Sequence, residues 1–181
     1  MSYPVFAAGD VLGAADMNAV GMWRLGEATM TNTTSVSLDG VFTTNYDNYL
    51  IIWQLTNSSA NSDNVFLKLR KSGSPSSTGY YNQWIYSLST GNPTNANAAN
   101  EARWTIGYAG NRRASGFLNL FGPRLTQTTA FIWQGGGISN GGTGLIASGQ
   151  GVHDVADFYD GFQIETGTNM TGKFIVYGYR K

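Results

Sequence analysis

Short segments in which apolar and polar residues alternate recur along most of this chain, and no amphipathic helical pattern separates them. Residues 64–73 alternate apolar and charged side chains, while residues 48–57 form a nearly continuous apolar run. A period of two is typical of a strand with one buried face, and a continuous run is typical of a strand covered on both faces. Roughly eight to ten such segments, about 10–18 residues apart, predict an all-β fold, either a β-sandwich or a jelly roll.

The segments between the expected strands are rich in Gly, Ser, Thr and Asn, which favour turns. Residues 90–102 predict a long loop because Asn and Ala dominate them. Residues 135–151 predict a flexible glycine-rich loop that carries one small strand around Leu145 and Ile146. Residues 110–113 and 168–171 predict hairpin turns between neighbouring strands.

One short stretch near the start of the chain has helical character. Residues 13–20, with the sequence GAADMNAV, are rich in the good helix formers Ala and Met, and Gly21 is expected to end the helix. Two turns are too few to be stable alone in water, so this helix must dock on another surface. We therefore divide the chain into an N-terminal arm, residues 1–22, and a jelly-roll-like β-sandwich domain, residues 23–181.

Charged residues are scarce and balanced in this sequence. They make up 12% of the chain, with 11 Lys plus Arg against 11 Asp plus Glu, so the formal net charge is zero. Such a balance provides little attraction for nucleic acid or for an anionic membrane, and we expect neither as a partner. The chain has no cysteine, which excludes disulfides and thiolate metal sites. It shows no secretion signal and no apolar run of membrane-spanning length, so we expect synthesis in a cytoplasm.

Two short patterns resemble catalytic or cofactor motifs, but each lacks the context that the chemistry needs. Residues 137–141 match the G-x-S-x-G pattern of a serine hydrolase, with His153 downstream as the only histidine. That motif requires a helix after the serine, and the glycine-rich sequence that follows predicts none. Residues 142–147 partly fit a dinucleotide fingerprint, which also requires a following helix. We therefore predict a protein that is not an enzyme and carries no cofactor.

A small acidic cluster surrounds the single histidine. Its members are His153, Asp154, Asp157 and Asp160. Oxygen ligands could hold calcium, but the spacing lacks the regular pattern of a calcium loop, and Asp commonly begins turns. We favour turn-forming aspartates and an ordinary loop histidine, and we predict no metal site. Glycoside hydrolysis by two carboxylates remains an alternative, with Glu101, Asp157, Asp160 and Glu165 as the available acids.

Aromatic side chains on the expected strands are candidates for stacking on sugar rings. The set comprises Trp84, Tyr86, Trp104, Tyr108 and Trp133. Strand aromatics more often fill the core of a sandwich, so both interpretations stay open. Two arginines, Arg112 and Arg113, occupy an expected loop tip, where binding residues concentrate. The candidate glycan contacts are therefore Trp84, Trp104, Arg112 and Arg113.

The N-terminal sequence FAAGDVLGAADMNAV combines an aromatic residue, a Gly-acid turn and a short helix, in which Gly13 stands where a capping Thr or Ser is usual. This combination resembles the opening of virion proteins of tailed bacteriophages, including minor tail proteins, fibres and head-decorating proteins. The C-terminal sequence YDGFQIETGTNMTGKFIVYGYRK resembles the closing hairpin of phage β-sandwich modules. YDNYLIIWQL, followed by VFLKLRKSG, resembles their paired strands.

The resemblance implies a non-enzymatic structural protein of a virion that is assembled in the bacterial cytoplasm. We expect a minor tail or fibre component that forms a homo-oligomer, a trimer, contacts other virion proteins, and projects its sandwich for host attachment, with a host surface glycan as a further partner. The resemblance assigns virion anchoring to Phe6, Asp10, Val11, Leu12, Ala15 and Met17. A capsid decoration protein that bridges major capsid subunits is the first alternative, and a carbohydrate-binding module is the second.

Overall fold

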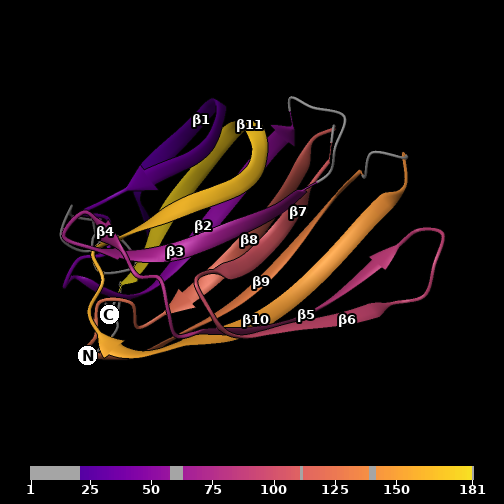
Figure 1. Ribbon diagram of the computed structural model, residues 1–181. Helices are drawn as coiled ribbons and strands as arrows, with labels where there is room; N and C mark the ends of the chain where they lie inside the picture. The colour runs from indigo at the N-terminus through magenta and orange to yellow at the C-terminus, as the bar shows by residue number, and fades with distance from the viewer. Residues whose placement is uncertain (1–20, 58–62, 111, 139–141, 181) are drawn as a thin grey trace, which may run out of the picture.

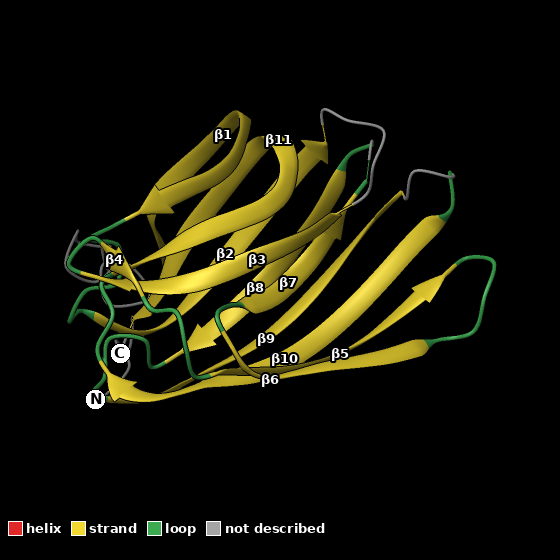
Figure 2. Ribbon diagram, in the orientation of Figure 1, coloured by secondary structure: helices red, strands yellow, loops and turns green. Residues whose placement is uncertain are grey.

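The computed structural model describes residues 21–57, 63–110, 112–138 and 142–180, and within these ranges the protein consists of strands without any helix (Figures 1 and 2). This result confirms the all-β prediction. The strands are β1 (Met22–Leu38), β2 (Tyr46–Asn57), β3 (Asp63–Lys71), β4 (Ser74–Pro75), β5 (Tyr80–Leu88), β6 (Thr94–Glu101), β7 (Trp104–Ala109), β8 (Ala114–Phe121), β9 (Gln127–Ile138), β10 (Gly144–Asp157) and β11 (Gly161–Arg180). None of the described residues forms a helix able to cross a membrane.

All strand pairs are antiparallel and belong to one curled sheet. Its order is β4-β3-β11-β2-β8-β9-β10-β5-β6, while β1 pairs with β11 and β7 pairs with β3. The curl brings β7 across β9 without any pairing between these two strands. In Figure 1, β1 and β11 lie at the opposite end of the curl from β5 and β6. The concave side holds the hydrophobic core, because alternate residues of β2, β3 and β11 are buried there.

Strand β11 is 20 residues long and changes partner midway. Residues 161–166 pair with β3, residues 170–180 pair with β2, and β1 accompanies both halves. The predicted hairpin at residues 168–171 is therefore wrong, because the chain continues as one strand through the buried Met170. The resemblance implied that β2 and β3 pair with each other. They do not, because β11 lies between them.

Two further segments expected as loops are strands. Residues 90–102 contain β6, in which Ala96 and Ala98 are partly covered while Asn95 and Asn97 are exposed. Residues 135–151 belong mostly to β9 and β10, which pair in continuous register. The hairpin predicted at residues 110–113 would pair β7 with β8, but β7 pairs with β3 whereas β8 pairs with β2 and β9.

Glycines within these strands make room for tryptophan rings. Trp53 is 1% exposed, and a Cβ atom at Gly107 or Gly116 would lie 2.4 or 2.6 Å from its ring. At Gly149 a Cβ atom would lie 2.6 Å from Nε1 of Trp133. The strands therefore contain glycine where a neighbouring indole passes over the backbone, a position that tolerates no side chain. This packing accounts for the glycine at position 149 within β10.

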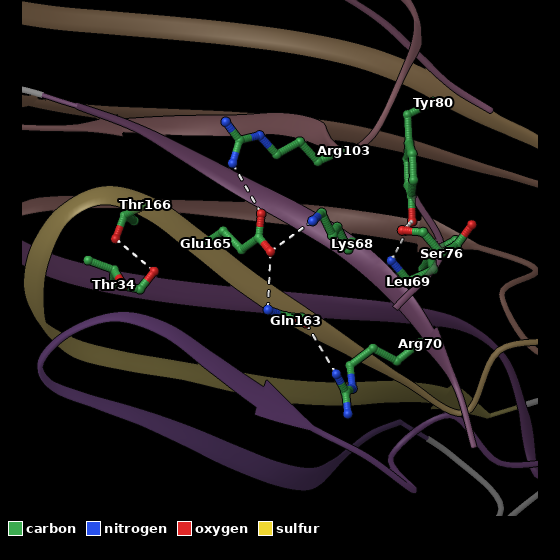
Figure 3. Close-up of polar contacts among 10 residues, drawn as sticks. All are labelled: Thr34, Lys68, Leu69, Arg70, Ser76, Tyr80, Arg103, Gln163, Glu165 and Thr166. Atoms are coloured by element: carbon green, nitrogen blue, oxygen red, sulfur yellow. Dashed lines mark hydrogen bonds and ion pairs between the residues drawn. The ribbon is translucent and has the colours of Figure 1, made fainter. Parts of the chain in front are cut away.

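A buried tyrosine replaces a missing strand partner beside β3. The hydroxyl of Tyr80 accepts a hydrogen bond of 2.8 Å from the backbone N–H of Leu69 and donates one of 3.3 Å to the carbonyl of Ser76 (Figure 3). The Tyr80 ring packs edge-on against Trp104, with centroids 5.1 Å apart. The pairing of β3 with β7 stops at Leu67, opposite Trp104. The Tyr80 side chain therefore satisfies the backbone N–H of Leu69, which lies just beyond that pairing.

The predicted arm, residues 1–22, lies almost entirely outside the described residues, as does the predicted helix over residues 13–20. Strand β1 begins at Met22. The division into arm and β domain stays a prediction.

Candidate functional site

A cleft of about 370 Å³ opens between β5, β9 and β10 on one side and β3 and β7 on the other. We call it the aromatic cleft. Its lining residues are Asn64, Trp84, Tyr86, Leu88, Ala96, Thr105, Gly107, Tyr108, Trp133, Leu145 and Ala147. Trp84, Tyr86 and Tyr108 are half-buried, so part of each ring faces the opening. The cleft therefore presents aromatic and neutral polar groups together.

One polar group in the aromatic cleft has no partner. Trp133 is 2% exposed, and its Nε1–H finds no hydrogen-bond acceptor among the described residues. Gly149 pairs with both Trp133 and Trp84, and the Trp133 Nε1 atom lies directly over this glycine. The unpaired N–H therefore lies over β10, the strand between those that carry Trp84 and Trp133. A buried donor without an acceptor costs about 1–3 kcal/mol, which a ligand oxygen would recover.

The candidate glycan contacts occupy three different environments. Trp84 lines the aromatic cleft. Trp104 is completely buried, stacks on Phe131 at 4.2 Å between centroids, and donates its Nε1–H to the carbonyl of Val152. It therefore has no surface for a sugar ring, and we remove it from the candidate contacts. Arg112 and Arg113 are exposed, and neither lines the cleft.

The histidine expected in a loop is instead a core residue of β10. His153 is 0% exposed, and its ring lies 4.3 Å from that of Tyr80. Its Nδ1 lies 3.1 Å from the Tyr159 hydroxyl and its Nε2 lies 2.9 Å from the Thr78 carbonyl, which fits a neutral ring with the proton on Nε2. Burial lowers the pKa of His153. The loop prediction is wrong because β10 extends to Asp157 and carries the histidine on its inner face.

The aspartates near His153 serve turns and ion pairs. Asp157 accepts hydrogen bonds from Lys71 Nζ, at 2.7 and 2.8 Å, and from the N–H of Phe158. The Lys71 hydrogen bonds are the main cause of the lowered pKa of Asp157. Asp160 accepts from the N–H of Ser72. Within the described ranges, no three His, Asp or Glu side chains are placed to hold a metal ion.

Glu165 is the centre of an ion-pair network on β11 (Figure 3). Its carboxylate lies 2.8 Å from Lys68 Nζ and 3.1 Å from Arg103 Nη1, and Gln163 donates a further hydrogen bond. Burial alone would raise the pKa of this carboxyl, but the hydrogen bonds from Lys68 and Arg103 outweigh it and the pKa lies below its usual value. Arg103 also lies over the ring of Phe66. This glutamate holds β11, β3 and the start of β7 together.

The convex side of the sheet carries a second candidate surface, which sequence reasoning missed. Strands β2, β8, β9, β10, β5 and β6 present uncharged residues outward in aligned rows. We call this surface the uncharged face. Its residues are Asn48, Leu50, Ile52, Gln54, Ser115, Phe117, Asn119, Phe121, Ala130, Ile132, Gln134, Gly136, Ile146, Ser148, Gln150, Val152, Tyr81, Gln83, Ile85, Ser87, Asn95 and Asn97.

Charged residues border the uncharged face without entering it. Lys173 on β11 pairs in register with Gln54 and forms an ion pair with Glu27 of β1. Asp154 follows the last row on β10. Ile146 stands 76% exposed, and two grooves of about 490 and 700 Å³ run over β5, β6, β9 and β10. The signal in the sequence was the stretch from residue 125 to 152, which contains no charged residue.

The predicted anchoring residues and the serine of the G-x-S-x-G pattern lie outside the described residues. They are Phe6, Asp10, Val11, Leu12, Ala15, Met17 and Ser139. Their assignments stay predictions.

The sequence matches no protein-family model, and a search of curated proteins finds no match. The fold, the aromatic cleft and the uncharged face are therefore the features of the molecule that bear on its function.

Proposed function

We propose that this protein is a non-enzymatic structural subunit of a phage virion, of the minor tail or fibre type, that assembles with copies of itself through the uncharged face. Residues 1–22 dock the subunit on another virion protein, and the β domain projects for host attachment. We assign this domain to the jelly-roll-like sandwiches, because the sheet curls until β7 covers β9. The sequence resemblance supplies the virion setting, and the surface supplies the mode of assembly.

The uncharged face is the observation that carries the proposal. The face spans six strands about 4.8 Å apart, five of which present four outward residues about 6.7 Å apart and β6 two, so it covers roughly 25 by 25 Å, or about 600 Å². An uncharged face of this size approaches the area of about 800 Å² that a standard interface buries on each partner. Depletion of charged residues is the compositional mark of an interface core.

The occupant of this face is a second copy of the chain. Its exposed apolar residues include Ile85, Phe117, Ile132 and Ile146, and its polar residues are amides and hydroxyls that can pair with their own kind. A partner with a charged surface would leave its charges desolvated and unpaired against it. Ile146 projects from this face and two grooves run over other parts of it, so Ile146 of one copy could enter a groove of the next in a head-to-tail contact, which closes into a ring such as a trimer.

The ionisable residues of the domain also support a structural role. Glu165, Asp157 and Asp39 each bind a lysine or arginine from a neighbouring segment, at 2.7–2.8 Å. These pairs join strands across the sheet and leave the carboxylates committed to partners.

A capsid decoration protein is the second candidate, because the same face would build a trimeric knob on a capsid. Quantitative mass spectrometry of purified particles distinguishes the two locations. Tens of copies per particle support a tail component, and hundreds support a capsid component. Absence of the protein from particles would overturn both. A variant lacking residues 2–21 should fold, by circular dichroism, but should not join particles.

The self-association is tested by analytical ultracentrifugation of the whole chain at tens of micromolar. We expect a trimer for the wild type and a monomer for Ile132→Glu, which places a charge at the centre of the uncharged face. Ser37→Glu, on the exposed side of β1, is the matched control and should stay trimeric. Thermal unfolding confirms that both variants fold. A monomeric wild type, or equal behaviour of the two variants, would contradict the proposed assembly.

A further inference from the structure

The aromatic cleft has the size and lining of a small-ligand site. Its volume of about 370 Å³ falls within the range of pockets that bind small molecules and holds one or two sugar rings. It is also separate from the uncharged face, because it opens on the other side of β5, β9 and β10. The inner-face residues Trp84, Trp133 and Ala147 line it, whereas their neighbours Ile85, Ile132 and Ser148 point outward.

The chemistry of the lining is aromatic and neutral. Four aromatic side chains, Trp84, Tyr86, Tyr108 and Trp133, surround the cleft, and no charged residue in the described ranges lines it. Indole and phenol faces pack well against the apolar C–H face of a pyranose ring. An acidic sugar would bring a carboxylate into a site without a cation, which is costly. The lining therefore favours a neutral sugar over a charged one.

A second observation is the unpaired Trp133 Nε1–H, which lies over Gly149 on β10. The matching group of Trp104 is bound to a backbone carbonyl, so this sheet does satisfy an indole where an acceptor is near. Trp23 and Trp53 also leave Nε1 unpaired, but neither lines the cleft. A ligand hydroxyl would accept from Trp133, and the side chains of Asn64 and Thr105 add neutral hydrogen-bonding groups to the same lining.

From these contacts we propose that the aromatic cleft binds a neutral hexopyranose unit of a glycan, with Trp84 stacking on the sugar and Trp133 donating to a sugar hydroxyl. This inference names the ligand class for the host attachment proposed above and rests on that function for its biological setting. It places the glycan site away from Trp104, Arg112 and Arg113. Binding in the cleft does not require the uncharged face to be paired.

The proposal is tested by NMR on the whole protein with ¹⁵N-labelled tryptophan, whose five indole N–H signals are assigned with single Trp→Phe variants. The probes are methyl glycosides and trisaccharides of glucose, galactose, mannose and N-acetylglucosamine, with sialyllactose as the acidic sugar. We expect a saturable shift of the Trp133 signal with at least one neutral sugar and none with sialyllactose. Trp84→Ala should weaken this binding at least tenfold, and Ile85→Ala, the outward neighbour on β5, should not change it.

Each other result overturns the inference. One such result is that the Trp133 signal does not shift with any neutral sugar at tens of millimolar, and another is that the protein binds only the acidic sugar. A third is that the Trp84→Ala and Ile85→Ala variants bind sugar equally well. Binding of an apolar probe such as indole without any sugar would assign the cleft to a hydrophobic ligand instead. The monomeric Ile132→Glu variant should bind sugar normally. If the Ile132→Glu variant stays trimeric, the proposed assembly is refuted. If the wild type binds no sugar, only the proposed glycan site in the aromatic cleft is refuted.

Discussion

Replacement of Tyr80 by Phe removes one oxygen atom from the core and leaves a buried backbone donor without an acceptor. The Leu69 N–H now bonds the Tyr80 hydroxyl at 2.8 Å, and both residues are 0% exposed, so water cannot substitute. Burial raises the pKa of this hydroxyl, which therefore stays protonated and continues to donate to Ser76 at any ordinary pH. The ring contacts with Trp104 and His153 survive in Phe, so the variant isolates the hydroxyl.

The expected magnitude follows from the lost hydrogen bond. A buried donor left unsatisfied costs about 1–3 kcal/mol of unfolding free energy. For a chain of this length each kcal/mol lowers Tm by about 2–4 °C, so Tyr80→Phe should lower Tm by about 2–12 °C. The matched control is Tyr81→Phe, because Tyr81 is the next residue on β5, faces outward and is 37% exposed. Substitutions at such positions change stability by about 0.5 kcal/mol or less.

Differential scanning calorimetry and urea unfolding of the two variants and the wild type measure this difference. The measurements are made on the Ile132→Glu background, so that a change in association does not alter the apparent stability. A Tyr80→Phe variant that loses no more stability than Tyr81→Phe would refute the view that this hydroxyl replaces a strand partner of β3.

Two further changes probe the core and the strand glycines. Burial lowers the pKa of His153 in the folded protein below the ordinary value of about 6.5, so the unfolded chain binds the proton more tightly. The free energy of unfolding should therefore be at its full value above about pH 6.5 and should fall as the pH drops below it. Tm measured from pH 8 to pH 5 should show this slope, and His153→Gln should flatten it; an equal slope in both proteins would exclude this histidine as the cause. A Cβ atom at Gly151 would lie 2.2 Å from the Tyr81 carbonyl oxygen and 2.5 Å from the Phe131 ring, so Gly151→Ala should lose about 3 kcal/mol or more. Gly91→Ala, where no atom lies within 4 Å, should leave urea unfolding unchanged, and equal stability of the two variants would contradict the packing argument.

The sequence predicted the fold class but not which segments would join the sheet. Alternation in residues 64–73 reports a buried face directly, and β3 lies there. The glycine-rich segment 135–151 looks flexible from local propensity alone. Its described residues up to Ile138 and from Gly144 belong to β9 and β10, where Gly135 and Gly149 pack against the indoles of Trp53 and Trp133, and no local pattern contains that information. The turn-like residues 168–171 were misread for the same reason, since β1 and β2 hold them extended.

The candidate site was predicted in part. Trp84, Tyr86, Tyr108 and Trp133, proposed from the sequence as stacking residues, all line the aromatic cleft, whereas Trp104 does not. Period-two alternation tells which residues share a face of a strand, but not which stretch of that face another strand covers. Trp104 is buried because β7 crosses over β9, and that crossing depends on the whole curl of the sheet.

The position of β11 determines when this domain can fold during synthesis. Residues 161–180 lie between β2 and β3 and also pair with β1. These three strands are synthesised early, and their hydrogen bonds to β11 can form only after residues 161–180 have been made. Closing contacts so distant in sequence is slow, and open strand edges recruit other chains in the meantime. Nascent chains that stop before residue 161 should therefore bind chaperones or aggregate. On a polysome, where several such chains lie close together, correct assembly of subunits would compete with aggregation from the start.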